Sequence, residues 1–472
     1  MRYLDQFYID GHFVPAIGRA QRTIVNPATL ESVGDIAMGS QEDVNAAVAA
    51  ARRSFPSFSA SSRDVRLGIL RRMDELFVER REEFARRMTL EMGTPITFSR
   101  QAQVEGARAH ILNGIEILER FEFEKTRGRT TLLMEPVGAC GLITPWNFPI
   151  LQIITKLVPA LAVGCTVVLK PSEYSPLSAM YLAELLHDAD IPPGVFNLVN
   201  GDGATVGAAI ASHPDLDMVS FTGSTRAGVL VATAAASSVK RVHQELGGNS
   251  ANIVLPDADL ETAVKAGVHA AYRNAGQSCT APGRMLIHRS QYERAVPMAK
   301  EAADNFRSGD IFDEDTLLGP VVNETQFKRA KALIDVGLAE GATLITGGLD
   351  FPPCIDKGYF IRPTVFANVT REMRIAREEM FAPIVSLIAY DTVEEAVDIA
   401  NDTPYGLAGY VQGPDRTALE VASQLRVGQV QINQPQWDPS APFGGYKQSG
   451  NGREYGEAGF EAYLETKAVI KA

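Results

Sequence analysis

The stretch 139-ACGLITPWNFPILQIITKLVPALAVGCTVVLKPSEYSPLSAMYLAELLHDADIPPGVFNLV-199 decides the fold class of this 472-residue chain. Three short apolar runs in it are typical of buried strands, and two segments between them have helical composition or period: Ala139–Thr144, Thr166–Leu169 and Val195–Val199, then Leu151–Val163 and Pro176–His187. Strands that alternate with helices predict βαβ units, a parallel sheet and helices on both of its faces.

The alternation continues downstream through further strand-like and helical segments: strands Met218–Phe221, Asn252–Leu255, Arg284–His288, Ile384–Ala389, Leu407–Gln412 and Gln429–Ile432, and helices Thr205–Ala211 and Ala227–Ser237. Upstream, helices are expected from Ser40 to Phe55, where Ser40 and Asp43 resemble a capping box, and from Ser62 to Glu91. The chain is too long for one hydrophobic core. We therefore predict two doubly wound α/β domains joined near Leu246–Gly248.

Composition and charge exclude several classes of protein. The formal net charge is −12, whereas binding to nucleic-acid phosphates needs a basic surface, so no nucleic-acid partner is expected. The apolar run Leu157–Leu169 is too short to span a bilayer, and no targeting leader is apparent, so no membrane partner and a cytoplasmic location are expected. The four cysteines lack C-x-x-C spacing, so neither a metal site nor a disulfide framework is expected.

Two segments far apart in the sequence have strand-like character outside these domains. Glu122–Glu135 is polar and strand-compatible, and Ala462–Lys471 alternates apolar and polar residues. They could pair with each other and then with another subunit, as a small β extension of the fold.

Two stretches carry side chains suited to covalent catalysis. Cys279 lies in Gly276-Gln-Ser-Cys-Thr-Ala-Pro-Gly-Arg284, between a helical stretch and a strand, where a thiol can be accessible enough to react. Glu245 lies in Gln244-Glu-Leu-Gly-Gly-Asn249, which is expected to be a turn where a carboxylate can move and meet a water. Each residue alone has a plainer interpretation, as a buried structural thiol and as a solvated loop carboxylate.

Three further stretches follow predicted strands. Asn147, in Thr144-Pro-Trp-Asn-Phe-Pro149, could donate to a developing oxyanion or form an Asx turn. Lys170 and Glu173 could bracket a ribose or form a surface ion pair. Residues 221–228, Phe-Thr-Gly-Ser-Thr-Arg-Ala-Gly, place backbone N–H groups at a helix start, which suits a pyrophosphate. The glycines of residues 201–207 have one spacer too many for the G-x-G-x-x-G pattern.

The order and spacing of these five stretches resemble the aldehyde dehydrogenase superfamily. The resemblance includes Glu379-Met-Phe-Ala-Pro383 and Pro442-Phe-Gly-Gly-Tyr-Lys447, and it runs over essentially the whole chain from Tyr8-Ile-Asp-Gly11 onward. It implies oxidation of an aldehyde to a carboxylic acid with NAD, or alternatively NADP.

The resemblance implies a catalytic set of Cys279, Glu245, Asn147 and Lys170. Cys279 would be the nucleophile that forms a thiohemiacetal and then a thioester. Asn147 and the Cys279 backbone N–H would hold the oxyanion, and Glu245 would activate the hydrolytic water.

For the cofactor, the resemblance implies that Lys170 and Glu173 contact the adenosine ribose, and a glutamate there disfavours a 2′-phosphate and so favours NAD. The full set of implied cofactor residues is Ile143, Thr144, Pro145, Trp146, Lys170, Glu173, Gly203, Gly207, Phe221, Thr222, Gly223, Ser224, Glu245, Leu246, Gly247, Glu379 and Phe381. Two positions depart from the family pattern. Ala382 stands where a glycine is usual, and Arg226-Ala227 replaces an acidic and then an aliphatic residue.

The implied substrate residues are Asn147, Gln152, Thr155, Arg273, Ser278, Thr280 and Trp437. Thr155 stands where many relatives have a bulky aromatic residue, which suggests a wider tunnel. Arg273 occupies a position that some semialdehyde dehydrogenases use to hold a distal carboxylate. An ω-oxo acid or semialdehyde is therefore one hypothesis for the substrate, and a structural ion pair at Arg273 is the alternative.

The resemblance also implies a division of the chain and an assembly. Residues 1–117 and 137–247 would form the NAD-binding domain, residues 248–448 the catalytic domain, and residues 118–136 and 449–472 the oligomerisation segments of a homodimer or homotetramer. Two other functions stay open at this point: a coenzyme A-acylating semialdehyde dehydrogenase, and a non-catalytic protein that keeps the fold.

Overall fold

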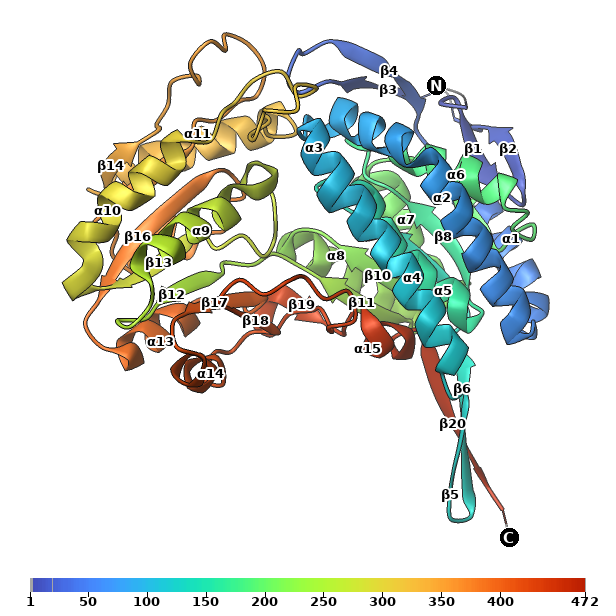
Figure 1. Cartoon of the computed structure of the whole chain (residues 1–472). Helices are drawn as coiled ribbons and strands as arrows, with labels where there is room; N and C mark the ends of the chain where they lie inside the picture. Colours follow the sequence, from blue (N-terminus) through green and yellow to red (C-terminus); the bar gives the residue numbers. More distant parts are fainter. Residues whose placement is uncertain (1–2, 19, 472) are drawn as a thin grey trace.

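The computed structural model describes residues 3–18 and 20–471, which form two α/β lobes and a projecting arm (Figure 1). The first lobe is built on a sheet of strand order β19-β11-β10-β7-β8-β9-β1-β2. The five central strands, β9, β8, β7, β10 and β11, are parallel to one another. The edge strands β19, β1 and β2 pair antiparallel. The bounds are β1 Gln6–Ile9, β2 His12–Pro15, β7 Ala139–Ile143, β8 Thr166–Lys170, β9 Phe196–Leu198, β10 Met218–Thr222, β11 Arg241–Glu245 and β19 Gly450–Asn451.

Helices cover both faces of this sheet because its strands are apolar on both sides. Cys140 and Leu142 of β7 belong to one hydrophobic core, whereas Ala139 and Ile143 of the same strand belong to another. One face carries α2 Arg63–Met92, α4 Glu105–Arg120, α5 Pro149–Val163 and α6 Leu177–Asp188, and the other carries α1 Gln41–Ser59, α7 Ala208–Ser212 and α8 Thr225–Ala235. This two-sided covering confirms the predicted doubly wound arrangement.

The second lobe repeats this architecture with a sheet of order β14-β15-β16-β13-β12-β17-β18, parallel except for β14. Its strands are β12 Ala251–Val254, β13 Arg284–His288, β14 Thr343–Thr346, β15 Thr364–Ala367, β16 Ile384–Tyr390, β17 Ala408–Gln412 and β18 Gln429–Ile432. Its helices are α9 Leu260–Tyr272, α10 Arg289–Asp304, α11 Glu324–Ala339, α12 Arg374–Arg377, α13 Val393–Asn401 and α14 Asp415–Ala422. The domain boundaries expected from the resemblance stay predictions.

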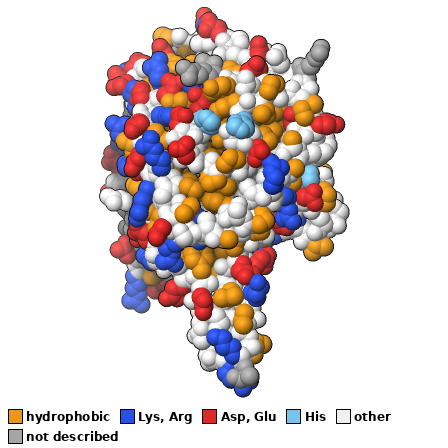
Figure 2. Space-filling view, turned by 90° about the vertical axis from the view of Figure 1, so that its right-hand side faces the viewer, with side chains coloured by type: hydrophobic (Ala, Val, Ile, Leu, Met, Phe, Trp, Pro, Cys, Tyr) orange, Lys and Arg blue, Asp and Glu red, His pale blue; other side chains and the backbone are white. Residues whose placement is uncertain are grey.

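An antiparallel arm of order β20-β6-β5 projects from the first lobe, with β5 Glu124–Arg127, β6 Thr130–Pro136 and β20 Leu464–Ile470. The predicted pairing of the two distant segments is confirmed, with Leu464 opposite Pro136 and Ile470 opposite Thr130. Figure 2 shows the arm standing clear of the body, with hydrophobic and basic side chains on its surface. The fold also has a two-stranded sheet, formed by β3 Gln21–Val25 and β4 Ser32–Ala37, and the short helices α3 Ile96–Phe98 and α15 Gly456–Glu461.

Local sequence signals set the ends of the long helices. Ser40 accepts from the Asp43 backbone and Asp43 returns the bond, so the predicted capping box at the start of α1 is confirmed. Ser62 caps α2, and Gly93 ends that helix in the left-handed conformation. One expectation was wrong: Glu245 is the last residue of strand β11 and not part of a turn. Strand β11 was missed because its sequence, Arg-Val-His-Gln-Glu, is mostly polar although its last three residues are buried.

An added methyl group should have opposite effects on stability at Gly68, inside helix α2, and at Gly93, which ends that helix. Gly68 is exposed within the helix and a Cβ there meets nothing within 4 Å, whereas at Gly93, with φ +74, a Cβ would lie 2.5 Å from Pro320 Cγ and 2.8 Å from Pro27 Cγ. Gly68→Ala should therefore stabilise by up to about 1 kcal/mol, because alanine has the higher helix propensity.

Gly93→Ala should destabilise by roughly 1–3 kcal/mol, because it adds both backbone strain and a steric clash. The midpoints of thermal and urea unfolding of the two variants and the parent protein measure these effects. Equal midpoints for the two variants would contradict the assignment of Gly93 as a left-handed cap.

Candidate active site

The carboxyl ends of four parallel strands bring predicted site residues to one edge of the first sheet. The strand register places Ile143 of β7 beside Lys170 of β8 and beside Phe221 of β10. Thr222, the next residue of β10, lies beside Glu245 at the end of β11. The topological switch lies between β7 and β10, where a doubly wound sheet binds its ligand.

Lys170 and Glu173, predicted to contact a ribose, lie together at this edge. Lys170 is buried, and its Nζ donates to Pro171 O at 2.8 Å and lies 3.3 Å from Glu173 Oε2. A Cβ on Gly207 would lie 3.7 Å from Lys170 Cδ, so the segment 203–207 is adjacent. Desolvation lowers the pKa of Lys170 and the Glu173 carboxylate opposes this shift. The two side chains do form an ion pair, but its lysine is buried, so it is not the surface pair of the alternative interpretation.

The segment after β10 and the start of α8 offer unused polar groups. Ser224 caps α8 by accepting from Ala227 N at 3.3 Å, and Gly223 N donates to Glu245 O at 3.0 Å. The hydroxyls of Thr222 and Thr144 are buried without a partner, and open space surrounds Gly203. Ile143, Phe221 and Leu246 form the apolar floor behind them. Orphaned hydroxyls beside a helix N-terminus fit the phosphate and ribose groups of a dinucleotide.

Trp146 and Phe381 bring the two lobes together beside this edge. Their rings pack edge to face with centroids 5.4 Å apart, and Glu379 Oε1 accepts from Gly248 N at 3.0 Å. A Cβ on Gly247 would lie 2.5 Å from Glu379 Oε2, so the carboxylate lies directly on this turn. Phe381 has φ +51, whereas Ala382 is not among the residues with positive φ. Alanine in place of the family's glycine therefore causes no backbone strain at position 382.

Asn147 and Cys279 are held together by a buried amide network. Asn147 Nδ2 donates to Gln277 O at 3.0 Å, and Asn274 Nδ2 donates to Asn147 O at 2.8 Å. Gln277 Oε1 accepts from Val322 N at 2.9 Å, so the turn before Cys279 is fixed from both sides. The Asn147 side chain does not make the Asx turn that was the alternative, and Cys279 itself is partly accessible. This arrangement presents a thiol next to a neutral amide donor.

The electrostatic surroundings of Cys279 disfavour its thiolate. Desolvation raises its pKa most, and the Glu379, Glu245 and Glu454 carboxylates raise it further. Three acidic side chains therefore lie close enough to influence the thiol. Glu379 has its own pKa raised to about 7 by burial, so its negative charge is fully present only above neutral pH.

Glu245 is buried beside residues that the sequence did not single out. Its carboxylate oxygens are buried without a hydrogen-bond partner, and desolvation and then Glu454 raise its pKa well above the usual range. Lys156 of α5 forms a fully buried ion pair with Glu454, and His243 Nε2 lies 3.5 Å from Glu245 Oε1. Lys156 was detectable, as the lone charge in the apolar run of residues 149–163.

The predicted substrate residues divide into two groups. Ser278 and Thr280 flank Cys279, with Ser278 Oγ 3.0 Å from Thr280 Oγ1, whereas Arg273 is exposed and lies over the Phe98 ring at 5.6 Å. Trp437 is exposed and packs on His110. In contrast, the Thr155 hydroxyl lies 3.3 Å from Gln152 O and 3.5 Å from Glu454 Oε2, so it is engaged inside the protein, and Gln152 Oε1 is buried without a partner.

Within residues 3–18 and 20–471, Arg273 has no ion pair with an acidic side chain, so the structural interpretation of that arginine has no support there.

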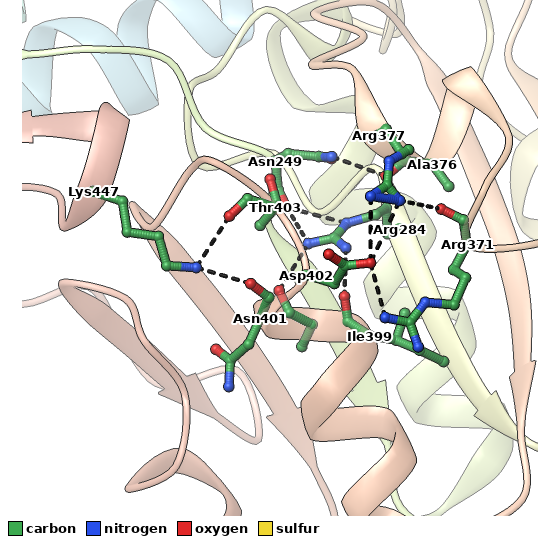
Figure 3. Close-up of polar contacts among 11 residues, drawn as sticks. Asn249, Arg284, Arg371, Ala376, Arg377, Ile399, Asn401, Asp402, Thr403 and Lys447 are labelled. Carbon is green, nitrogen blue, oxygen red and sulfur yellow. Dashed lines mark hydrogen bonds and ion pairs between the residues drawn. The ribbon is translucent and has the colours of Figure 1, made fainter.

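A buried arginine fixes the turn that follows Glu245 (Figure 3). The Arg284 guanidinium donates to Asn249 O and to Ile399 O and Ala400 O at the end of α13. Asn249 Nδ2 in turn donates to Ala376 O in α12, which precedes Glu379. The turn after Glu245 and the Glu379 segment are therefore held by the same buried hydrogen bonds.

In the part of the chain that the structure describes, no three His, Cys, Asp or Glu side chains are grouped to hold a metal ion. No helix there has both the length and the apolar character that crossing a membrane requires.

Comparisons with known proteins place these features in a family. The profile of the aldehyde dehydrogenase family matches residues 13–469. The chain is 50% identical over 472 residues to a 3-succinoylsemialdehyde-pyridine dehydrogenase from a Pseudomonas species, covering 100% of this chain and 99% of that protein.

Solved structures agree with this match. A cysteine-to-alanine mutant of aldehyde dehydrogenase C from Pseudomonas syringae, bound to NAD⁺ and octanal, has 53% identity and a TM-score of 0.98 over 99% of this chain and 97% of that chain. An aldehyde dehydrogenase from Bartonella henselae has 42% identity and a TM-score of 0.97, covering 99% of each chain.

The charge on Glu379 should control the reactivity of Cys279. Glu379→Gln removes the largest electrostatic contribution that raises the thiol's pKa, so the thiolate fraction and the rate of alkylation by iodoacetamide should rise several-fold at pH 8. Below pH 7 the difference should shrink, because Glu379 itself becomes protonated there.

Glu378→Gln is the matched control, since its carboxylate pairs with Arg374. Alkylation is followed by mass spectrometry of the peptide that contains Cys279. Equal rates for the parent protein and Glu379→Gln at pH 8 would show that Glu379 does not influence the thiol.

Proposed function

The chain belongs to the aldehyde dehydrogenase family and is an NAD-dependent oxidoreductase that acts on aldehydes, and from this premise we propose how its own residues divide the reaction. Cys279 is the nucleophile, Asn147 and the Cys279 backbone N–H hold the oxyanion, and Glu245 is the general base for hydrolysis. The observation that carries the proposal is the juxtaposition of a partly accessible thiol, a buried amide donor and a buried, unpartnered carboxylate.

In the first half-reaction the Cys279 sulfur, as thiolate, attacks the aldehyde carbon. A C–S bond forms, the carbonyl π bond breaks, and its electron pair becomes an alkoxide. The Asn147 Nδ2 group and the Cys279 N–H stabilise this oxyanion, and removal of one such donor typically costs about 10²–10³ in rate. Because its pKa is raised, Cys279 is a thiol at neutral pH and its proton has to leave before the attack. Glu379, which raises that pKa more than the other carboxylates do, is the nearby acceptor.

The residues at the carboxyl edge of the first sheet fit a dinucleotide. Lys170 and Glu173 would hold the adenosine ribose, the start of α8 would face the pyrophosphate, and Glu379 with Phe381 would line the nicotinamide-ribose side. Bound NAD supplies the hydride acceptor, so that a two-electron oxidation of the substrate carbon leaves a thioester on Cys279. Glu173 disfavours a 2′-phosphate at that position, which supports NAD over NADP.

In the second half-reaction a water molecule has to attack the thioester carbon. Glu245 would accept one proton from this water, and the C–S bond breaks to release the carboxylic acid and restore the thiol. The raised pKa of Glu245 suits a base, because a stronger proton acceptor works better near neutral pH. The relatives described above are named as dehydrogenases, and nothing in these matches supports the coenzyme A-acylating alternative.

We propose an aldehyde with a remote acidic or polar group as the substrate. One relative is named for a semialdehyde and another was solved with octanal, so both chemistries occur among similar proteins. In this chain the Arg273 guanidinium lies over the Phe98 ring. Arg273 and Cys279 both affect the pKa of Tyr410, so Arg273 is near enough to contact a substrate bound at the thiol. An unpaired guanidinium there suits a terminal carboxylate.

The assembly of the enzyme, the bounds of its domains and its location in the cell are expected from the sequence alone. A homodimer or homotetramer assembled through the arm, the division at residues 117–137 and 247–248, and a cytoplasmic location stay predictions. The exposed Val469 and Ile470 of β20 support a role of the arm in contacts between subunits.

Substitution of the two catalytic candidates should separate the two half-reactions. Cys279→Ala should abolish NADH formation, whereas Glu245→Gln should give a burst of about one NADH per site followed by turnover reduced at least about 10²-fold. Stopped-flow absorbance at 340 nm measures both phases. Cys354→Ala, which changes an exposed cysteine, should retain full activity. Sustained native turnover in Glu245→Gln would remove Glu245 from the role of base.

A panel of hexanal, benzaldehyde and 6-oxohexanoate tests the substrate class. Arg273→Leu should lower kcat/KM for 6-oxohexanoate by about 10-fold or more, which corresponds to the loss of a charge-assisted contact, and should leave hexanal within about 3-fold. Arg273→Lys is the matched control and should retain part of the preference for the acid. An equal loss for all three aldehydes would exclude Arg273 as the carboxylate contact.

A further inference from the structure

We propose that His243 is a positioning residue for Glu245: its Nε2–H group receives the Glu245 carboxylate and holds the base in its waiting position. This inference rests on the proposed role of Glu245 as the general base. Successive side chains of a strand point to opposite faces, so His243 and Glu245, two residues apart on β11, share one face. Gln244 between them points the other way, where its Nε2 bonds Gly228 O of α8.

Gly444 lies directly against the Glu245 side chain, and Gly452 lies directly against the His243 side chain. A Cβ on Gly444 would lie 2.8 Å from Glu245 Oε1, and a Cβ on Gly452 would lie 2.4 Å from His243 Cδ2. The imidazole and the carboxylate are both almost fully buried, at 4% and 3% side-chain exposure, and their nearest atoms are 3.5 Å apart. Both side chains are therefore shielded from solvent.

Neither group has a hydrogen-bond partner among the described residues. Both ring nitrogens of His243 and both carboxylate oxygens of Glu245 are buried and unpartnered. A buried polar group without a partner is costly, and within the described part of the chain each of these two side chains faces only the other at ion-pair distance. A shift of a few tenths of an ångström brings Nε2 and Oε1 within hydrogen-bonding range.

The charged groups that face this pair are already engaged or lie farther away. Lys156 of α5 is bound to Glu454, and Arg453 donates to Gly445 O and Gly452 O. Cys279 lies in the loop before β13, and the Glu245 carboxylate raises its pKa. Burial lowers the pKa of His243 to about 4, so the ring is neutral at physiological pH and donates through one N–H only. Since only Nε2 faces an acceptor, Glu245 selects the Nε2–H tautomer.

A neutral donor suits a base that has to move. It stabilises the carboxylate form of Glu245 against the desolvation and the Glu454 charge, which both favour the protonated form. It does not bind the carboxylate as an ammonium or guanidinium group would, so the side chain remains able to leave toward the thioester. Without this donor Glu245 should take up a proton at higher pH and start from a less defined position.

The test compares His243→Leu with His243→Gln, which keeps an N–H donor of similar reach. With saturating NAD and the panel aldehyde of highest kcat/KM, rapid quench measures NADH for acylation and free carboxylic acid for hydrolysis. In His243→Leu the acylation phase should be unchanged, while hydrolysis at pH 7 should fall about 10-fold and its acidic limb should move up by about one pH unit. His243→Gln should restore the native limb.

Several results would overturn the proposal. Release of free acid at the native rate in His243→Leu, or an acidic limb of hydrolysis that stays where it is in the parent protein, would show that His243 only fills space. A uniform loss of both phases with a lower unfolding temperature, not rescued in His243→Gln, would show the same. Glu245→Gln, run in parallel, separates the two ideas: native hydrolysis in that variant removes the base assignment itself.

Discussion

Hydrogen bonding between parallel strands is the constraint on which the site depends. The register between β8, β7, β10 and β11 places Lys170, Ile143, Thr222 and Glu245 at one edge of the first sheet. A slip of one residue in any of these strands would turn its side chains to the opposite face. The apolar cores on both faces of the sheet fix the register, because Ala139 and Ile143 pack on one side and Cys140 and Leu142 on the other.

The second lobe completes the site by supplying the thiol and the residues around it. Cys279 precedes β13, and Glu379 precedes β16 of the same sheet. The two lobes are tied by side chains that bond the backbone of the other, as Asn274 does with Asn147 O. Arg284 stabilises this arrangement from behind, since it is buried and bonds only backbone carbonyls from the turn after Glu245 and the end of α13 (Figure 3). A buried cation that satisfies carbonyls at a helix end is favourable, because the helix dipole is negative there.

Acidic groups dominate the centre of the site, and burial controls their charge. Glu245 and Glu379 both have raised pKa values, mainly through desolvation, and Cys279 is held as a thiol by the same environment. Burial therefore shifts all three groups toward their protonated forms. The Lys156–Glu454 pair and the neutral His243 lie behind Glu245, so the environment of this base is set by residues from three separate parts of the chain.

The sequence alone determined the fold class, the two α/β units, the long helices with their caps and the main chemical groups. These features depend on local composition and period, which act over a few residues: Ser40 with Asp43 caps α1, and alternating apolar runs form β7 and β8. Only the tertiary structure decided which side chains face one another. The partners Lys156 and Glu454 are 298 residues apart, and β11 is polar in sequence yet ends in buried residues. Their contacts depend on strand register and on which helix covers which face, and no local pattern records either.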